Sequence, residues 1–247
     1  MSALILALVA GAVVGLALGA LGGGGSVLAV PALIYLLGFA PAAATTASLV
    51  IVTATSLTAL YAHARAGNVR WKAGMLFAAA GLVPAAVAGA ATAHLPQALL
   101  TAAFAAVAAL AAARMLRPAR AAAGHPQRAV RPARAARAGA GLGALTGLLG
   151  VGGGFLAVPA LVTVLAFEMQ AAVGTSLLVI SANSLATRGA TTAGADWAVI
   201  APFTGAAILG AWDGKRLAAK VTGTLLKRTF ALVLLAVAAF MLVDAFA

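Results

Sequence analysis

The sequence predicts an all-α polytopic membrane protein made of two inverted repeats, each with a Gly-rich broken or re-entrant helical hairpin followed by three transmembrane helices. Three observations support this prediction: an apolar composition, a duplicated glycine motif and the placement of the basic residues. Of the 247 residues, 64% are hydrophobic and only four are acidic, and the mean hydropathy is +1.11. A soluble domain of this size cannot bury that much apolar surface, so we expect the chain to lie in a lipid bilayer.

The composition also excludes several classes of protein. Without cysteine there is no disulfide framework, thiol nucleophile or thiolate metal site. The net charge of +12 comes from basic residues between apolar segments, which favours anchoring at the inner leaflet over nucleic-acid binding. Segment 2–21 lacks a basic start, so we expect it to be part of the fold and not a cleaved signal. We predict no cofactor, no metal and no nucleic acid, with a small anion and membrane lipid as partners and a homodimer left open.

A duplication divides the chain into two halves. The motif LAVPAL occurs at 28–33 and again at 156–161, an offset of 128 residues. The same register aligns two sets of glycines, Gly11, Gly15, Gly19 and Gly22 with Gly139, Gly143, Gly147 and Gly150. We therefore predict repeat one at 1–114, a basic cytoplasmic linker at 115–137 and repeat two at 138–247.

The apolar segments follow the same order in both halves. They are 3–22, 26–38, 43–62, 73–93 and 97–114, then 138–150, 154–167, 170–188, 197–214 and 224–246. A crossing needs about 20 residues, and the two glycine-flanked segments of repeat two are shorter than that. Each glycine break is therefore either one broken crossing or the tip of a re-entrant hairpin. Segment 3–22 is long enough to cross alone, and neither alternative accounts for its extra turns.

The loop charges favour the re-entrant alternative. Broken crossings give parallel repeats, with 11 Lys and Arg residues inside and five outside, whereas re-entrant hairpins give inverted repeats, with 15 inside and one outside. The positive-inside rule prefers the second arrangement. In inverted-repeat transporters, paired short segments interrupted by Gly or Pro indicate a substrate site near the membrane midplane.

The glycine breaks predict an anion site made of backbone. We expect new half-helices to begin at Ser26 and at Gly154, because a helix N-terminus presents unpaired N–H groups and a partial positive charge. Glycine allows a ligand to approach the backbone closely, and the basic residues of the apolar segments, Arg188 among them, lie only near segment ends. The predicted backbone ligands are Gly23, Gly24, Gly25, Ser26, Gly152, Gly153 and Gly154.

Polar side chains near both breaks extend this prediction. The candidate ligands for an oxyanion are Thr46, Ser48, Thr55, Thr175, Ser176 and Asn183. The alternative is that these side chains bond to backbone carbonyls or join helices. The glycines spaced by four before each break have the small-xxx-small pattern, which predicts close helix packing.

The few ionisable residues offer little chemistry. We expect Asp213 to pair at the interface with neighbouring basic residues. His63, His94 and His125 are expected in or near loops, so we predict no proton relay; the alternatives are a uniporter, a potential-driven exporter or coupling through an unidentified group. Ser26 resembles a nucleophile, but no His or Lys within the apolar segments is expected to activate it, so we predict that the protein is not an enzyme.

Two stretches carry a family resemblance, GALGGGGSVLAVPALIYLLGFAPAAATTAS and GLLGVGGGFLAVPALVTVLAFEMQAAVGTS. Together they resemble the sulfite exporter TauE/SafE family over nearly the whole chain, although the first half reads GGGGS where the family more often has GVGGG. The resemblance implies a multi-pass permease of a bacterial or archaeal inner membrane that moves sulfur-containing anions such as sulfite or organosulfonates.

From these observations we predict a transporter that binds its anion at the midplane between two Gly-rich half-helix N-termini and works by alternating access. The alternative is a non-transporting membrane assembly or anchoring subunit. An anchor has no need of a glycine break in both halves.

Overall fold

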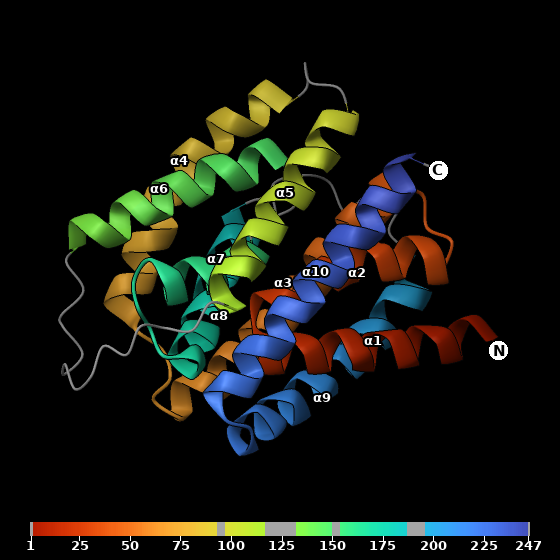
Figure 1. The fold of residues 1–247 in the computed structure, drawn as a ribbon. Helices are drawn as coiled ribbons and strands as arrows, with labels where there is room; N and C mark the ends of the chain where they lie inside the picture. Colours follow the sequence, from red (N-terminus) through yellow and green to blue (C-terminus); the bar gives the residue numbers. More distant parts are fainter. Residues whose placement is uncertain (1, 93–96, 117–131, 150–153, 187–195, 247) are drawn as a thin grey trace.

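The computed structural model describes residues 2–92, 97–116, 132–149, 154–186 and 196–246 (Figure 1). Within these ranges the chain is helical and contains no strand, so the predicted all-α class is confirmed. The helices are α1 (Ser2–Leu21), α2 (Gly23–Pro31), the π-helical segment η1 (Ala32–Leu36), α3 (Pro41–Arg65), α4 (Trp71–Thr92), α5 (Gln97–Leu116), α6 (Pro132–Leu149), α7 (Gly154–Thr163), α8 (Met169–Ala186), α9 (Trp197–Lys220) and α10 (Gly223–Phe246).

Four helices among the described residues, α1, α3, α4 and α10, are long and apolar enough to cross a membrane. Large apolar side chains also lie on the outside of the bundle, including Val13, Val83 and Leu209, the last two at 71% exposure. A contiguous apolar exterior of this kind marks a surface that contacts lipid. The protein is therefore a helical membrane protein.

The first glycine cluster is mostly helical, which corrects one predicted boundary. We expected the second helix of repeat one to begin at Ser26, but α2 begins at Gly23. Only Gly22 leaves the helical conformation, with φ +67° and ψ −118°. The chain needs a single glycine to reverse direction, and the packing of α2 overrides the weak helix propensity of the three that follow.

The start of α6 is a second correction. We expected this helix at 138–150, but α6 begins at Pro132 and has 18 residues. Proline suits the first helical position, because its missing N–H has no partner there in any case. Residues 132–137 of the predicted linker are thus helical, and the argument from shortness does not hold for α6.

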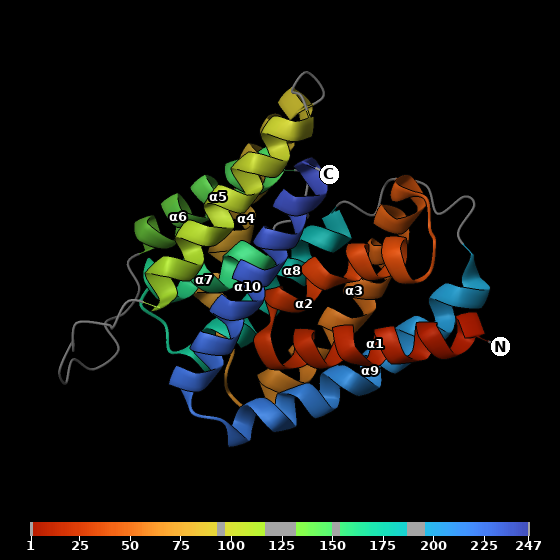
Figure 2. The ribbon, with the colours of Figure 1, turned by 45° about the vertical axis from the view of Figure 1, so that its right-hand side comes forward.

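Two helix pairs are packed through glycine. α1 and α9 lie side by side and run in the same direction, so that Gly11, Gly15 and Gly19 face the backbone of Phe203, Ala207 and Ala211 (Figure 2). In the same way, Gly139 and Gly143 of α6 face Phe77 and Gly81 of α4. The predicted close packing of these glycines is confirmed, and each pair joins a helix from one half of the sequence to a helix from the other.

The centre of the bundle also joins the two halves. There α3 packs against α8, α2 against α7, and α5 against α10. The buried core between these helices contains Leu18, Ile51, Leu177, Phe104 and Phe230. The polar residues predicted for the site lie at or near these central contacts.

α1 and α2 form a hairpin. After Gly22 the chain turns, and α2 returns beside α1 toward η1 and α3 (Figures 1 and 2). The N–H of Gly22 donates to the carbonyl of Leu18 at 2.8 Å, which closes the last turn of α1. The extra length of segment 3–22 is therefore accounted for, because α1 packs along α9 as far as Gly19.

Candidate functional site

The turn at Gly22 lies directly against α8. A Cβ at this position would be 2.5 Å from Oγ of Ser176 and 3.2 Å from the carbonyl oxygen of Val173, and the positive φ already disfavours any other residue. Both Gly22 and Ser176 are buried. The structure therefore brings a predicted hydroxyl of the second half to the glycine turn of the first half.

The predicted backbone ligands lie at the start of α2. Gly23 is its first residue and is buried, and Gly24, Gly25 and Ser26 complete the first turn. Gly22, which precedes the helix, offers no side chain to cap it. The positive end of the α2 dipole is consequently at the buried turn, where it favours a negative charge.

The second glycine cluster is only partly described. Gly154 is the first residue of α7, as predicted. Gly152 and Gly153 lie outside the described residues. The geometry of the site is therefore built from the first turn alone.

Three of the predicted hydroxyls are buried and bonded within their own helices. Ser48 donates to the carbonyl of Thr45 at 2.8 Å, Thr55 to that of Ile51 at 2.6 Å, and Ser176 to that of Val173 at 2.7 Å. A hydroxyl has one hydrogen, so each of these must leave its carbonyl before it can donate to an anion. These bonds agree with the alternative stated above, in which the side chains bond to backbone carbonyls. To bind an anion, each hydroxyl would have to exchange its carbonyl for an oxygen of the anion.

The candidate side chains do not form one cluster. Thr175 accepts a hydrogen bond from the N–H of Arg70 at 3.1 Å and so faces the turn after α3. Asn183 lies two turns beyond Ser176 on α8, about 10 Å along the helix axis, and lines a small cavity with Gly143 of α6. Thr46 is half-buried on α3. Of the predicted side chains, Ser176 is the one that the structure places at the turn.

A hydrogen bond that the sequence did not predict links the two halves. Oγ of Ser181 on α8 donates to Oγ of Ser56 on α3 at 3.0 Å, and both side chains are buried. The sequence showed hydroxyls at both positions but gave no sign of which pair meets.

His63 lies in the last turn of α3, next to the loop where we expected it, but its side chain is buried, at 3% exposure. Its Nε2 is 3.1 Å from the carbonyl oxygen of Gly19 in α1. Lys215 of α9 is close enough to act on the ring electrostatically. His94 and His125 lie outside the described residues.

The other ionisable groups lie at the periphery. Asp213 forms the predicted interfacial ion pair with Arg216 at 3.5 Å, with both side chains exposed. Asp196 caps α9, where its carboxylate accepts a hydrogen bond from the N–H of Ala198 at 3.1 Å. Within the described ranges, no three His, Asp or Glu side chains gather as metal ligands would.

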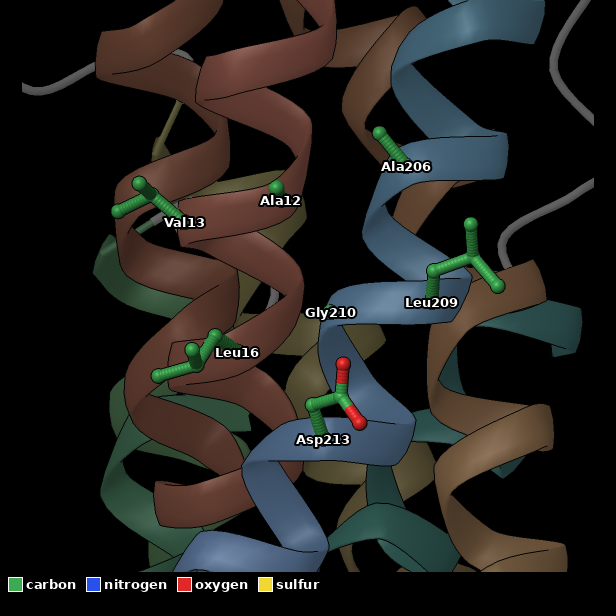
Figure 3. A pocket seen from close by; sticks show the side chains of 7 residues that line it. All are labelled: Ala12, Val13, Leu16, Ala206, Leu209, Gly210 and Asp213. Carbon is green, nitrogen blue, oxygen red and sulfur yellow. The ribbon is translucent and has the colours of Figure 1, made fainter.

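A shallow groove of about 320 Å³ runs between α1 and α9 on the outside of the bundle (Figure 3). Its lining is apolar, for example Val13, Leu16 and Leu209, apart from the carboxylate of Asp213. A negative charge beside an apolar wall repels an anion, so we do not place the anion site there.

Known proteins resemble this chain over most of its length. The family model described as Sulfite exporter TauE/SafE matches residues 7–241. A protein of Xylella fastidiosa (strain 9a5c), named probable membrane transporter protein, is 35% identical over 97% of this chain and 95% of its own length. A protein of the same name from strain Temecula1 is 34% identical over the same shares. No solved structure matches the chain.

Proposed function

The chain belongs to the sulfite exporter TauE/SafE family, and we propose that this membrane transporter moves small sulfur-containing anions such as sulfite or organosulfonates. The proposed anion site is the buried turn at Gly22, where the start of α2 meets Ser176. We further propose that the membrane is the inner membrane of a bacterium or archaeon, in agreement with the origin of both relatives from Xylella fastidiosa.

One observation carries the proposal: an uncharged, buried glycine turn lies against a hydroxyl at the positive end of a helix. Sulfite and sulfonate groups present several oxygens to hydrogen-bond donors. Backbone N–H groups and a hydroxyl bind such oxygens without a buried basic side chain. An uncharged site also releases its anion more readily than a site with a fixed cation, as a carrier requires.

We propose that the two halves, 1–114 and 138–247, are inverted in the membrane. The turn after α3 lies beside the first part of α8, since Arg70 bonds to Thr175 and a Cβ on Gly174 would meet the carbonyl of Asn68. Lys215, near the end of α9, acts on His63 near the end of α3. Parallel repeats would put the ends of α3 and α9 on opposite sides of the membrane, so these contacts support inversion and the positive-inside assignment.

The site can be tested with two matched serine and threonine variants. Ser176→Ala removes the hydroxyl at the turn, and Thr204→Ala removes a hydroxyl on α9 that makes the same kind of bond to its own helix, at 2.7 Å to Ile200. In proteoliposomes loaded with labelled sulfite or methanesulfonate, we expect Ser176→Ala to raise KM roughly tenfold, as for the loss of one hydrogen bond to a charged group. Thr204→Ala should transport like the wild type.

Two results would contradict the proposal in different ways. If the two variants behave alike, the anion does not bind at Ser176. If the wild-type protein moves neither anion while a control transporter in the same lipid works, the alternative of a membrane assembly or anchoring subunit is favoured.

A further inference from the structure

A buried histidine lies next to the proposed anion site. His63 is on α3, and its ring bonds to the carbonyl of Gly19, three residues before Gly22. The Cβ of His63 lies close to Gly174 of α8, two residues before Ser176, where an added Cβ would be 3.3 Å away. Three residues of helix rise about 4.5 Å and two rise about 3 Å. The imidazole is therefore within one helical turn of the glycine turn along both α1 and α8.

The hydrogen bond of the ring fixes where its hydrogen is. A carbonyl oxygen can only accept, so Nε2 of His63 must donate to Gly19. In the neutral ring Nδ1 is then an acceptor, and it has no hydrogen-bond partner among the described residues. Buried polar atoms are almost always paired, so a buried lone pair of this kind points to a transient partner.

The charged groups near His63 are positive. Lys215 of α9 acts on the ring electrostatically, Arg70 lies in the turn after α3, and the exposed Arg65 packs over the exposed ring of Tyr61. α1, α2 and α8 carry no charged side chain, and η1 carries only the exposed Tyr35. The nearest carboxylate along α9, Asp213, is exposed and paired with Arg216. Glu168, in the turn before α8, and Asp196 are exposed as well, so none of these three acids is buried beside the ring.

An anion at the glycine turn supplies the missing negative charge. Protonation of a ring in a positive, buried setting is unfavourable alone and becomes favourable when an anion is bound within one helical turn. By linkage, a bound proton then strengthens anion binding by the same factor. The proton and the anion consequently bind together more readily than either binds alone.

We propose that His63 is the proton-binding residue of this transporter and that it carries a proton on Nδ1 together with the anion at the glycine turn. This inference rests on the proposed function. The only bond that forms and breaks is the N–H bond at Nδ1: water gives the proton on the side where the anion enters and takes it back where the anion leaves. One anion and one proton move in the same direction, so an inward proton gradient drives anion uptake.

The test separates coupling from transport. Proteoliposomes with the membrane potential clamped at zero receive labelled methanesulfonate, a strong acid whose charge is constant across the pH range. Exchange of labelled for unlabelled anion at equal pH measures transport alone. With the outside one pH unit more acidic, one-to-one coupling should concentrate the anion inside roughly tenfold.

His63→Gln keeps an amide donor for Gly19 but cannot take the proton. We expect it to exchange the anion more slowly than the wild type, because no proton then strengthens anion binding, and to concentrate no anion. Arg65→Gln, two residues away and exposed, is the matched control and should concentrate the anion like the wild type. Absence of exchange in the wild type would contradict the proposed function. Exchange without concentration in the wild type, or concentration by His63→Gln, would overturn the role of His63 alone.

A second variant tests the proposal even if His63→Gln no longer exchanges labelled for unlabelled anion. Lys215→Gln removes the positive charge that faces the ring from α9. It should raise the pH at which proton-driven uptake is half-maximal. An unchanged half-maximal pH would overturn the proposal, because His63 would then not be the group that binds the proton.

Discussion

The glycine face of α1 yields a prediction whose magnitude follows from the structure. A Cβ on Gly15 would lie 2.5 Å from Cα and 2.6 Å from the carbonyl carbon of Ala207. Carbon atoms pack at about 3.5–4.0 Å, so Gly15→Ala forces α1 roughly 1 Å away from α9. Because these are backbone atoms, no side-chain rotation relieves the contact. The shift also loosens the neighbouring contacts of Gly11 and Gly19.

The expected cost can be compared with a matched control. Overpacking costs about 1–3 kcal/mol or more, against a gain of up to about 1 kcal/mol for alanine over glycine in a helix. We expect a net loss of about 1–2 kcal/mol, which lowers the apparent Tm by roughly 2–8 °C for a chain of this size. Gly205→Ala on α9 meets no atom within 4 Å, so its Tm should stay the same or rise.

The assay is thermal unfolding of both variants in one detergent. Membrane proteins often unfold irreversibly, so the comparison requires a single heating rate. An apparent Tm for Gly15→Ala equal to that of Gly205→Ala would refute the reasoning, because α1 and α9 would then not be packed backbone to backbone.

Three further predictions concern the turn, the crossing of α3 with α8, and the start of α9. Gly22→Ala should abolish anion uptake, because its φ of +67° and the nearby Ser176 exclude a Cβ; Gly67→Ala, with φ +74° and open space, should keep uptake. In a double-mutant cycle, alanine at Ser56 and Ser181 should show a coupling of roughly 0.5–1.5 kcal/mol in thermal stability, and zero coupling would mean that the bond does not form. Asp196→Ala should cost about 0.5–2 kcal/mol through loss of the cap, whereas Asp213→Ala, in an exposed pair, should leave Tm unchanged.

The order of the helices was predictable because the apolar segments are long and separated by polar or glycine-rich breaks. The residues at which the helices begin were harder to predict, as two of them show. Gly23 was assigned to a loop because glycine is a weak helix former, yet tertiary packing makes it helical. The start of α6 at Pro132 was missed because its Arg-rich composition suggested a linker, although Ala and Arg are strong helix formers and proline suits the first position.

Partners across the bundle were not predictable from local patterns. The spacing of Gly11, Gly15 and Gly19 predicted a close neighbour but not its identity, although Gly210 and Gly214 on α9 repeat the same spacing. The burial of His63 depends on the carbonyl of Gly19, 44 residues earlier, and nothing local signals that contact. Likewise, Ser176 was one of several candidate hydroxyls until the turn at Gly22 was found against it.

The contacts between the halves differ in how readily they can change. The glycine-packed pairs α1–α9 and α4–α6 are in backbone contact, so neither helix of a pair can shift without the other. The crossing of α3 and α8 instead includes the hydroxyl bond between Ser56 and Ser181, which can exchange for other partners after a small movement. If alternating access moves the bundle as rigid bodies, α1 must therefore travel with α9.

These contacts also determine which helices hold the proposed anion site. Gly22 is in the first half of the sequence, but it is fixed to α9 through α1 and faces α8 through Ser176, both from the second half. An anion at this turn would therefore lie between the α1–α9 pair and α8, and in the proposed transport cycle α3, which packs against both α8 and α9, is the helix whose movement would open or close the site. His63 lies on α3 and bonds to Gly19 of α1. Protonation of His63 on anion binding would then change the contact between α3 and α1, which is the contact that moves in the proposed cycle.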